Sequence, residues 1–321
     1  MKRLVLCALA AVLATTAATA QQDYPKRPIR LVVPFSAGGN TDVGARLLAN
    51  GLADVIGQQV IVENKVGAGA TIGTDVVAKA APDGYTLLFT TLAHSANPSI
   101  YAKLPYDGAK DFQPVAMVSI NDFVLVTNPD IEARDVDALI ALLKQRPGRL
   151  DYSSAGVGSA MHLAGELFKS VAGVDAVHVP YRGEGPALND LLGKRISFSF
   201  HGVSTTADHI KGGTVRALAV TGPTRSPLLP EIPTMKEAGL RNYEAYTWSV
   251  VLAPAGTPRE IVNRLNVAIN AVVRQPRMQQ RFTELGFQVV TDSTPESTAE
   301  HIRREEDKWA PIIKASGIRP N

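Results

Sequence analysis

The sequence predicts an α/β protein built from two domains, each with a mainly parallel sheet. From Arg27 onward, apolar strand-like segments alternate with helix-like segments. Strands separated by helices, with segments apolar on both faces, are typical of a parallel sheet covered on both sides. The alternation starts again near residue 123, and a chain of 321 residues is long enough for two domains of ordinary size.

The first domain is predicted from three strands and two helices. The turn Pro82-Asp83-Gly84 leads into the third strand. The predicted strands are 29–35, 58–64 and 84–91, and the predicted helices are 41–57 and 74–81. The first helix is predicted from one apolar stripe, formed by Val43, Leu47, Leu48, Leu52, Val55 and Ile56.

The second domain repeats this order, and a helical segment follows it. Its predicted strands are 123–128, 149–156, 176–181, 196–200 and 216–222, and its predicted helices are 135–147, 159–173 and 186–194. The segment 227–240 is rich in turns. A further strand is predicted at 246–254, and the last part is predicted to be helical over 258–286 and 294–316.

Residues 1–20 are typical of a cleaved secretory signal peptide. Lys2 and Arg3 precede an apolar run from Leu4 to Leu13, and Ala18-Thr19-Ala20 is an A-x-A cleavage site. The run is shorter than the roughly 20 apolar residues that span a bilayer. We therefore expect export to the periplasm after cleavage behind Ala20, without a membrane anchor.

The composition excludes several classes of function. The only cysteine, Cys7, lies in the leader, so the mature chain can form no disulfide, thiolate nucleophile or cysteine metal site. Without Lys2 and Arg3, 33 − 2 = 31 basic residues face 30 acidic ones, which lowers the net charge from +3 to +1. This balance gives no electrostatic footprint for nucleic acid or an anionic membrane.

Two loops share the same pattern of strand, Ser-Ala-Gly and helix start. They are VVPFSAGGNTD at 32–42 and DYSSAGVGSAMH at 151–162, one in each predicted domain. Ligands of open parallel sheets bind beyond the carboxyl ends of strands, and free N–H groups at helix N-termini attract anions. The pair predicts a cleft that holds a small carboxylate from both sides. Asp42 is interpreted instead as a first-turn acid that pairs with Arg46.

The chain resembles the Bug family, the solute receptors of tripartite tricarboxylate transporters. The resemblance covers nearly the whole mature sequence and depends on the order of several motifs. In the first half they are YPKRPIRLVVPFSAGGNTD (24–42), IVENKVGAGATIG (61–73) and AAPDGYTLL (80–88). Later motifs are YSSAGVGSAMHLAGELF (152–168), HVPYRGEGPALNDLL (178–192), GTVRALAVTG (213–222), PEIPTMKEAGL (230–240) and WSVVLAPAGTPREIVNRLN (248–266).

The resemblance implies a two-lobed periplasmic binding protein, a type II-like clamshell that acts as a monomer without cofactor or metal. Lobe 1 would contain residues 27–125 and 245–321, and lobe 2 residues 126–244. Such a receptor captures a small organic acid and delivers it to the membrane permease. The ligand-binding residues carried over are Phe35, Ser36, Gly38 and Gly39 in the first loop, and Ser154, Gly156 and Ser159 in the second.

Other strand ends supply further candidates for the cleft. Thr90, Thr91 and His94 follow the third strand, and Arg182 could bind a second ligand carboxylate bidentately or be a surface arginine. Many relatives carry an acidic residue where this chain has His201, which could donate to a carboxylate. Phe35, Phe198 and Phe200 belong either to the core or to a surface that stacks on an aromatic acid.

Enzymatic alternatives receive weak support from the motifs. A G-x-S-x-G elbow around Ser154 would need glycine at position 152, where the chain has Tyr152, and His162 lies only one turn beyond Ser159. The glycines of 67–73 lack dinucleotide spacing, and no H-E-x-x-H metal motif occurs. We therefore expect a receptor for a di- or tricarboxylate or an aromatic acid. The alternatives are an exported hydrolase or transferase and a sensory receptor.

Overall fold

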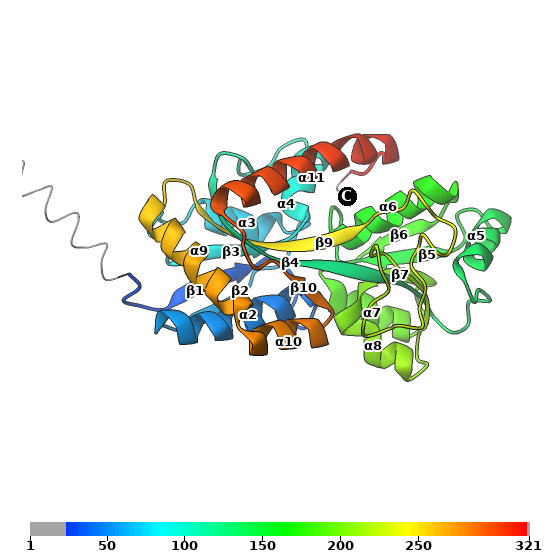
Figure 1. The fold of residues 1–321 in the computed structure, drawn as a ribbon. Coiled ribbons are helices and arrows are strands. Elements are labelled where there is room, and N and C mark those ends of the chain that lie inside the picture. Colours follow the sequence, from blue (N-terminus) through cyan, green and yellow to red (C-terminus); the bar gives the residue numbers. More distant parts are fainter. Residues whose placement is uncertain (1–23, 320–321) are drawn as a thin grey trace, which may run out of the picture.

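The computed structural model describes residues 24–319, so the predicted leader and its cleavage site lie outside the described part. The molecule is elongated and consists of two lobes that share one long strand, β4 (Phe112–Thr127) (Figure 1). The strands of the sheet follow the order β2-β1-β3-β9-β4-β7-β5-β6, with β8 and β10 also paired to β4. The predicted two-lobed α/β fold is confirmed.

The first lobe contains parallel strands at its outer edge. β1 (Ile29–Val33) pairs in parallel with β2 (Val60–Asn64) and with β3 (Thr86–Thr90). β9 (Tyr246–Pro254) runs antiparallel to both β3 and β4. β10 (Phe287–Val289) also pairs antiparallel with β4.

The second lobe repeats this arrangement around the other half of β4. β5 (Asp151–Ser154) runs parallel to β6 (Val177–Pro180) and to β7 (Phe198–Gly202). β7 and β8 (Arg216–Val220) both pair antiparallel with the last residues of β4. Each lobe therefore contributes its own parallel strands, and the strands β4 and β9, where the chain crosses between lobes, run antiparallel.

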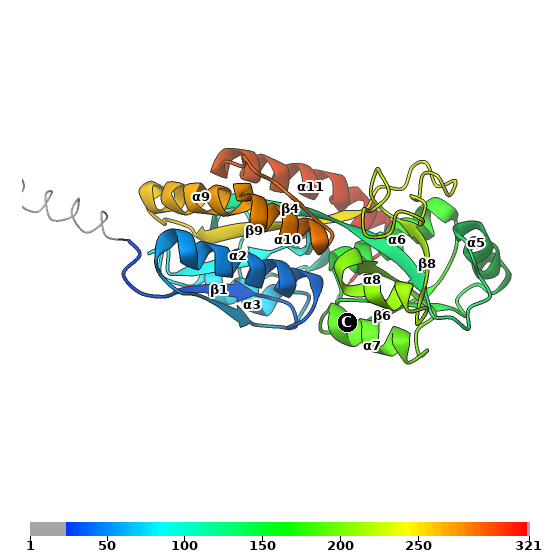
Figure 2. The same ribbon diagram turned by 60° about the horizontal axis from the view of Figure 1, so that its bottom comes forward.

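Helices cover both faces of the sheet (Figures 1 and 2). In the first lobe they are α2 (Asn40–Ile56), α3 (Thr71–Ala78), α4 (Ala93–Ile100), α9 (Arg259–Arg274), α10 (Pro276–Glu284) and α11 (Pro295–Ser316). In the second lobe they are α5 (Val136–Gln145), α6 (Ala160–Ala172), α7 (Glu184–Leu192) and α8 (Val203–Lys211). Every helix predicted from the sequence is present, with ends that differ by a few residues. The predicted helical region 258–286 is divided at Gln275 into α9 and α10.

The apolar core has three parts. The faces of α2, α9 and α10 bury one cluster against the first lobe's sheet, including Leu48, Leu52 and Phe282. A larger cluster continues through both lobes under α4, α6 and α11, and a smaller one lies under α7 and α8. The predicted stripe of α2 is therefore largely confirmed, although Val55 is 39% exposed near the helix end. Gly57 ends this helix in the left-handed conformation, with φ +69°.

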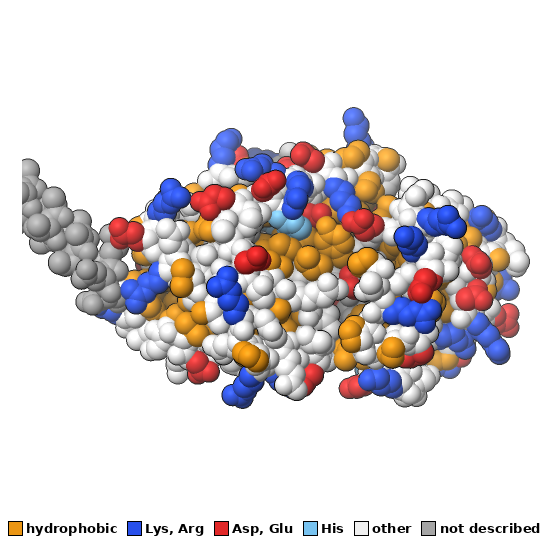
Figure 3. All heavy atoms as spheres, in the orientation of Figure 1, with side chains coloured by type: hydrophobic (Ala, Val, Ile, Leu, Met, Phe, Trp, Pro, Cys, Tyr) orange, Lys and Arg blue, Asp and Glu red, His pale blue; other side chains and the backbone are white. Residues whose placement is uncertain are grey.

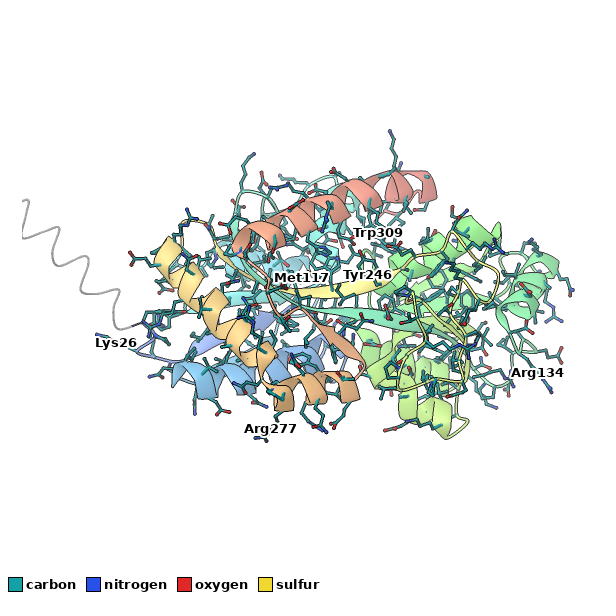
Figure 4. All side chains as sticks on the ribbon, viewed as in Figure 1. Lys26, Met117, Arg134, Tyr246, Arg277 and Trp309 are labelled. Atoms are coloured by element: carbon teal, nitrogen blue, oxygen red, sulfur yellow. The ribbon has the colours of Figure 1, made fainter. Side chains whose placement is uncertain are left out.

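The C-terminal helix α11 is hydrogen-bonded to β9 through one buried carboxylate. Glu305 is 4% exposed and accepts hydrogen bonds from Tyr246 Oη at 3.0 Å, Trp248 Nε1 at 3.1 Å and Trp309 Nε1 at 3.2 Å. Figure 4 labels Tyr246 and Trp309, which belong to β9 and α11. The last helix therefore packs on the sheet of the first lobe and also contacts α6.

Four elements of the structure were not predicted from the sequence, because their residues lack regular apolar periodicity. α4 contains Pro98, and α8 mixes threonine and charged residues with few apolar ones. The first half of β4 contains Pro114 and shifts its register against β9 on either side of Met117. β10 is only three residues long. Tertiary pairing with neighbouring strands determines these segments more than local propensity does.

The surface shows charges of both signs spread over both lobes (Figure 3). On the face drawn there, hydrophobic side chains gather near the middle, below α11. No helix within residues 24–319 is long and apolar enough to cross a membrane.

Candidate functional site

A small cavity lies where loops of both lobes meet the crossing strands. Its volume is about 30 Å³. Its lining residues are Phe35, Ser36, Gly39, Asn40, Thr41, Thr91, Phe123, Ala155, Ser159, Ala160, Met161, Glu184 and Thr247. Because this space holds only one or two waters, the lobes must separate to admit an organic molecule.

The first predicted loop forms one wall of this cavity. Phe35, Ser36 and Gly39 line it, but Gly38 does not. Gly38 is exposed in the left-handed region at φ +79°, and its N–H donates to Asp42 Oδ2 at 2.9 Å. The same Oδ2 accepts from Arg46 Nε at 2.9 Å, so the structural role predicted for Asp42 is confirmed. Burial alone would raise the pKa of Asp42, but the hydrogen bonds from Arg46 and Gly38 lower it below its ordinary value.

The second predicted loop forms the facing wall. Ser159 lines the cavity and caps α6, because its Oγ accepts from the His162 N–H at 3.3 Å. The next two residues, Ala160 and Met161, also line the cavity. Within residues 24–319, no protein acceptor binds the N–H group of either residue. The N-terminus of α6 therefore presents free donors and a partial positive charge to the cavity.

Ser154 and Gly156 belong to the second loop but do not line the cavity. Ser154 Oγ lies 2.6 Å from His178 Nε2 and also bonds to the backbone of Gly156. Gly156 has φ +123°, a conformation that strongly favours glycine. The two residues therefore shape the loop, and direct ligand contact by them stays a prediction.

The crossing strands form the remaining part of the cavity, with Phe123 from β4 and Thr247 from β9. Thr247 is 5% exposed, and its Oγ1 has no hydrogen-bond partner within residues 24–319. A buried hydroxyl without a partner costs free energy unless a ligand or water satisfies it. Thr91, which follows β3, also lines the cavity, as predicted.

Glu184 is one of the cavity residues that were not predicted from the sequence. It begins α7 in the second lobe and is 6% exposed. Its Oε2 accepts from the Asn40 N–H at 2.8 Å, across the lobe boundary at the start of α2. Its Oε1 accepts from the Gly202 N–H and from Thr205 Oγ1, each at 2.7 Å. The sequence signal was the acidic residue in YRGEGPALNDLL, which the motif comparison left without a role.

His201 lies beside Glu184 and is fully buried. Its Nδ1 is 3.3 Å from Glu184 Oε1, while its Nε2 has no partner within residues 24–319. Burial alone would raise the pKa of Glu184, but hydrogen bonds from His201, Thr205 and Asn40 lower it below its ordinary value. His201 does not line the cavity, so any effect of His201 on the site acts through its contact with Glu184.

The other predicted residues lie away from this cavity. Thr90 is buried in β3. His94 lines a separate pocket of about 480 Å³ beside α4 and α11, where its Nε2 lies 3.0 Å from the Gly108 carbonyl oxygen and burial lowers its pKa to about 4. Arg182 is exposed, and Phe198 and Phe200 are buried in the second lobe's core. Ligand contacts by these residues stay predictions.

The Ser154–His178 pair has the atoms of a nucleophile and a base. Ser154 is 0% exposed, and the pair lies outside the cavity lining. The His178 ring stacks on His162 at 3.8 Å between centroids, and burial lowers the pKa of each to about 3. Because Ser154 is fully buried and does not line the cavity, the pair stabilises the loop in this conformation.

Two lobes joined by crossing strands, with a cavity between facing strand–helix loops, define a solute-binding protein of the clamshell type. Residues 44–318 match the family model described as "Tripartite tricarboxylate transporter family receptor". The chain belongs to this receptor family, and the resemblance to Bug proteins is confirmed.

The relatives match over nearly the full chain. Protein BugT of Bordetella pertussis is 40% identical over 301 residues, 92% of this chain and 91% of BugT. The structure of the periplasmic binding protein BugD matches with a TM-score of 0.88 and 37% identity, covering 92% of this chain and 100% of BugD.

Two similar structures contain carboxylates. Rpa4515 of R. palustris with adipate has a TM-score of 0.89 and 36% identity, covering 93% of this chain and 100% of that one. MatC from Rhodopseudomonas palustris with bound malate has a TM-score of 0.86 and 32% identity, covering 90% of this chain and 100% of that one.

Proposed function

We propose that the chain is a periplasmic receptor that captures a small carboxylic acid between its lobes and delivers it to a tripartite tricarboxylate-type permease. The observation that carries this proposal is the meeting of free α6 N–H groups with the unpartnered Thr247 hydroxyl in one cavity. Both kinds of donor suit a carboxylate oxygen. Adipate and malate in the similar structures support the same ligand class.

Binding proceeds in this proposal by closure of the lobes. The lobe boundaries proposed are residues 27–125 with 245–321 and residues 126–244, which place the change of lobe within β4 and just before β9. The cavity has no room for an acid in the conformation described, so the ligand enters while the lobes are apart, and the lobes close around it to leave a wider cavity than this one. Closure then brings the first loop and the crossing strands around a carboxylate held by the free N–H groups of the second loop.

The receptor acts without covalent chemistry and as a monomer. Its leader is removed behind Ala20, a step that intact-mass measurement of the exported protein tests directly. The alternatives are an exported hydrolase or transferase that uses the same cleft and a sensory receptor. Mass spectrometry of the recovered ligand separates a receptor from a hydrolase, because only an enzyme returns an altered compound.

The test is a thermal-shift screen of residues 21–321 against small carboxylic acids, with sugars and nucleotides as controls. A ligand at a hundred times its dissociation constant adds about 2.7 kcal/mol to the free energy of unfolding. We expect at least one carboxylic acid to raise the melting temperature and to be recovered unchanged. Stabilisation by sugars or nucleotides alone would contradict the proposal.

A further inference from the structure

Glu184 places a carboxylate of the protein itself at one of the two predicted anion-binding loops. Gly39, the residue before α2, provides no side-chain cap, and Glu184 Oε2 caps the helix from the opposite lobe through the Asn40 N–H. A Cβ on Gly39 would lie 3.3 Å from Glu184 Cβ, so this loop and α7 are in close contact. The two lobes therefore meet through an acidic side chain at the site where a ligand carboxylate was expected.

The hydrogen bonds of Glu184 suit an ionised carboxylate. Its oxygens accept from the Asn40 and Gly202 N–H groups and from the Thr205 hydroxyl, and it is almost fully buried. His201 faces Oε1, whereas Asn40 faces Oε2. The negative charge at Oε2 offsets the partial positive charge that the start of α2 would otherwise offer to a ligand.

The N-terminus of α6 has no such internal anion. Ala160 and Met161 line the cavity, and their N–H groups have no protein acceptor in residues 24–319, while Ser159 Oγ is already used as the helix cap. The unpartnered Thr247 Oγ1, nine-tenths buried, belongs to the same cavity. The rest of the lining combines the apolar side chains of Phe35, Phe123 and Met161 with polar residues, namely Ser36, Asn40, Thr41 and Thr91. Ser36 Oγ also has no hydrogen-bond partner within residues 24–319.

We propose that Glu184 is a specificity-determining residue that restricts the receptor to acids with one carboxylate and an apolar body. This inference rests on the proposed function and narrows its ligand class. The ligand carboxylate occupies the α6 end beside Thr247, and its apolar part contacts Phe35 and Phe123. A second carboxylate reaching toward α2 meets the Glu184 charge and is repelled, because like charges close together in a partly buried site repel strongly.

A series of six-carbon acids tests this inference, because its members differ only at the far end. Hexanoate ends in a methyl group, adipate in a second carboxylate and 6-aminohexanoate in an ammonium group. Benzoate and terephthalate form an aromatic pair with the same contrast. Isothermal titration calorimetry of the wild-type chain should give an affinity for the monoacid about tenfold or more above that for the matching diacid.

The variant Glu184→Gln removes the charge and nearly preserves the shape. We expect it to raise the affinity for adipate relative to hexanoate, so that the ratio between the two falls toward one. Glu237→Gln is the matched control, since Glu237 also lies in the second lobe and accepts a backbone hydrogen bond from Thr234 at 2.7 Å, but does not line the cavity. This control should leave the ratio unchanged, and thermal melting should show that both variants are folded.

The outcomes separate the two proposals. If wild type binds adipate as tightly as hexanoate, the single-carboxylate inference is overturned while the carboxylate receptor stands. Tightest binding of 6-aminohexanoate overturns it as well, because Glu184 would then be a counter-charge for the ligand. An unchanged ratio in Glu184→Gln refutes the role of this residue. Binding of none of the acids overturns the proposed function together with the inference, and the wild-type ratio decides even if the variant does not fold.

Discussion

Replacing Gly39 with leucine should prevent the lobes from closing. Gly39 has φ −79°, which any residue adopts, so the substitution adds no backbone strain. Its Cβ would lie 3.3 Å from Glu184 Cβ in the other lobe, and the remaining side-chain carbons would enter a cavity of about 30 Å³. Overpacking of this kind costs about 1–3 kcal/mol in a closed core.

That cost should be seen in binding, because the lobes can stay open in the free protein. A loss of about 1–3 kcal/mol corresponds to an affinity reduced about 5- to 150-fold. The free energy of unfolding should change by less than about 1 kcal/mol, since glycine is a modest helix cap. Titration calorimetry with the best acid from the screen, together with urea denaturation, measures both quantities.

Gly212→Leu provides the control for this experiment. Gly212 has the same φ of −79° and is exposed at the end of α8, away from the cavity. We expect the control to bind like wild type. If Gly39→Leu also binds with wild-type affinity, contact between the first loop and Glu184 does not accompany ligand capture, and the closure argument is wrong.

Three further changes test other parts of the structure. Thr247→Val keeps the shape of the side chain but removes the unpartnered hydroxyl. The affinity for a carboxylate should therefore fall by about tenfold, with little change in melting temperature. Unchanged affinity in calorimetry would exclude this contact. Burial raises the pKa of Asp122 from 3.8 to about 6, so its favourable contribution, present below pH 3.8, is lost as the pH rises through 6. Asp122→Asn should therefore stabilise the fold at pH 7.5 by on the order of 1 kcal/mol but not at pH 3.5, as melting curves at both pH values would reveal. Glu305→Ala leaves two indole N–H groups and a tyrosine hydroxyl without their acceptor, and should destabilise the protein by about 3 kcal/mol in urea denaturation; a loss near zero would show that water replaces the carboxylate.

The parallel strands and the two loops could be predicted because each depends on local patterns. The apolar runs of β1 and β3 and the Ser-Ala-Gly turns are short signals that need no knowledge of distant partners. The loop residues Ser36, Gly39 and Ser159 were placed at the cavity for the same reason. The Asp42–Arg46 pair follows from helical spacing alone.

The rest of the site depends on contacts between residues far apart in the chain. Glu184 meets Asn40 across 144 positions, and no local pattern links the start of α7 to the start of α2. Thr247 and Phe123 line the cavity because the chain crosses between lobes beside it. His94 lies away from this cavity for a related reason, since it contacts the Gly108 carbonyl oxygen and lines another pocket.

The antiparallel pairing of β4 with β9 also fixes where the second lobe could be exchanged. Asn121 lies opposite Thr247, and opposed residues of such a pair have Cα atoms about 4.5–5.5 Å apart. With the proposed lobe boundaries, the second lobe is one uninterrupted stretch of chain whose two ends are neighbours. Joining a relative's stretch at these adjacent points would replace the α6 end, Glu184 and His201 together, while the outer surface of the first lobe stays the same. We expect a chimera of this kind to change ligand preference in a single recombination while α2, α9 and α10 stay the same.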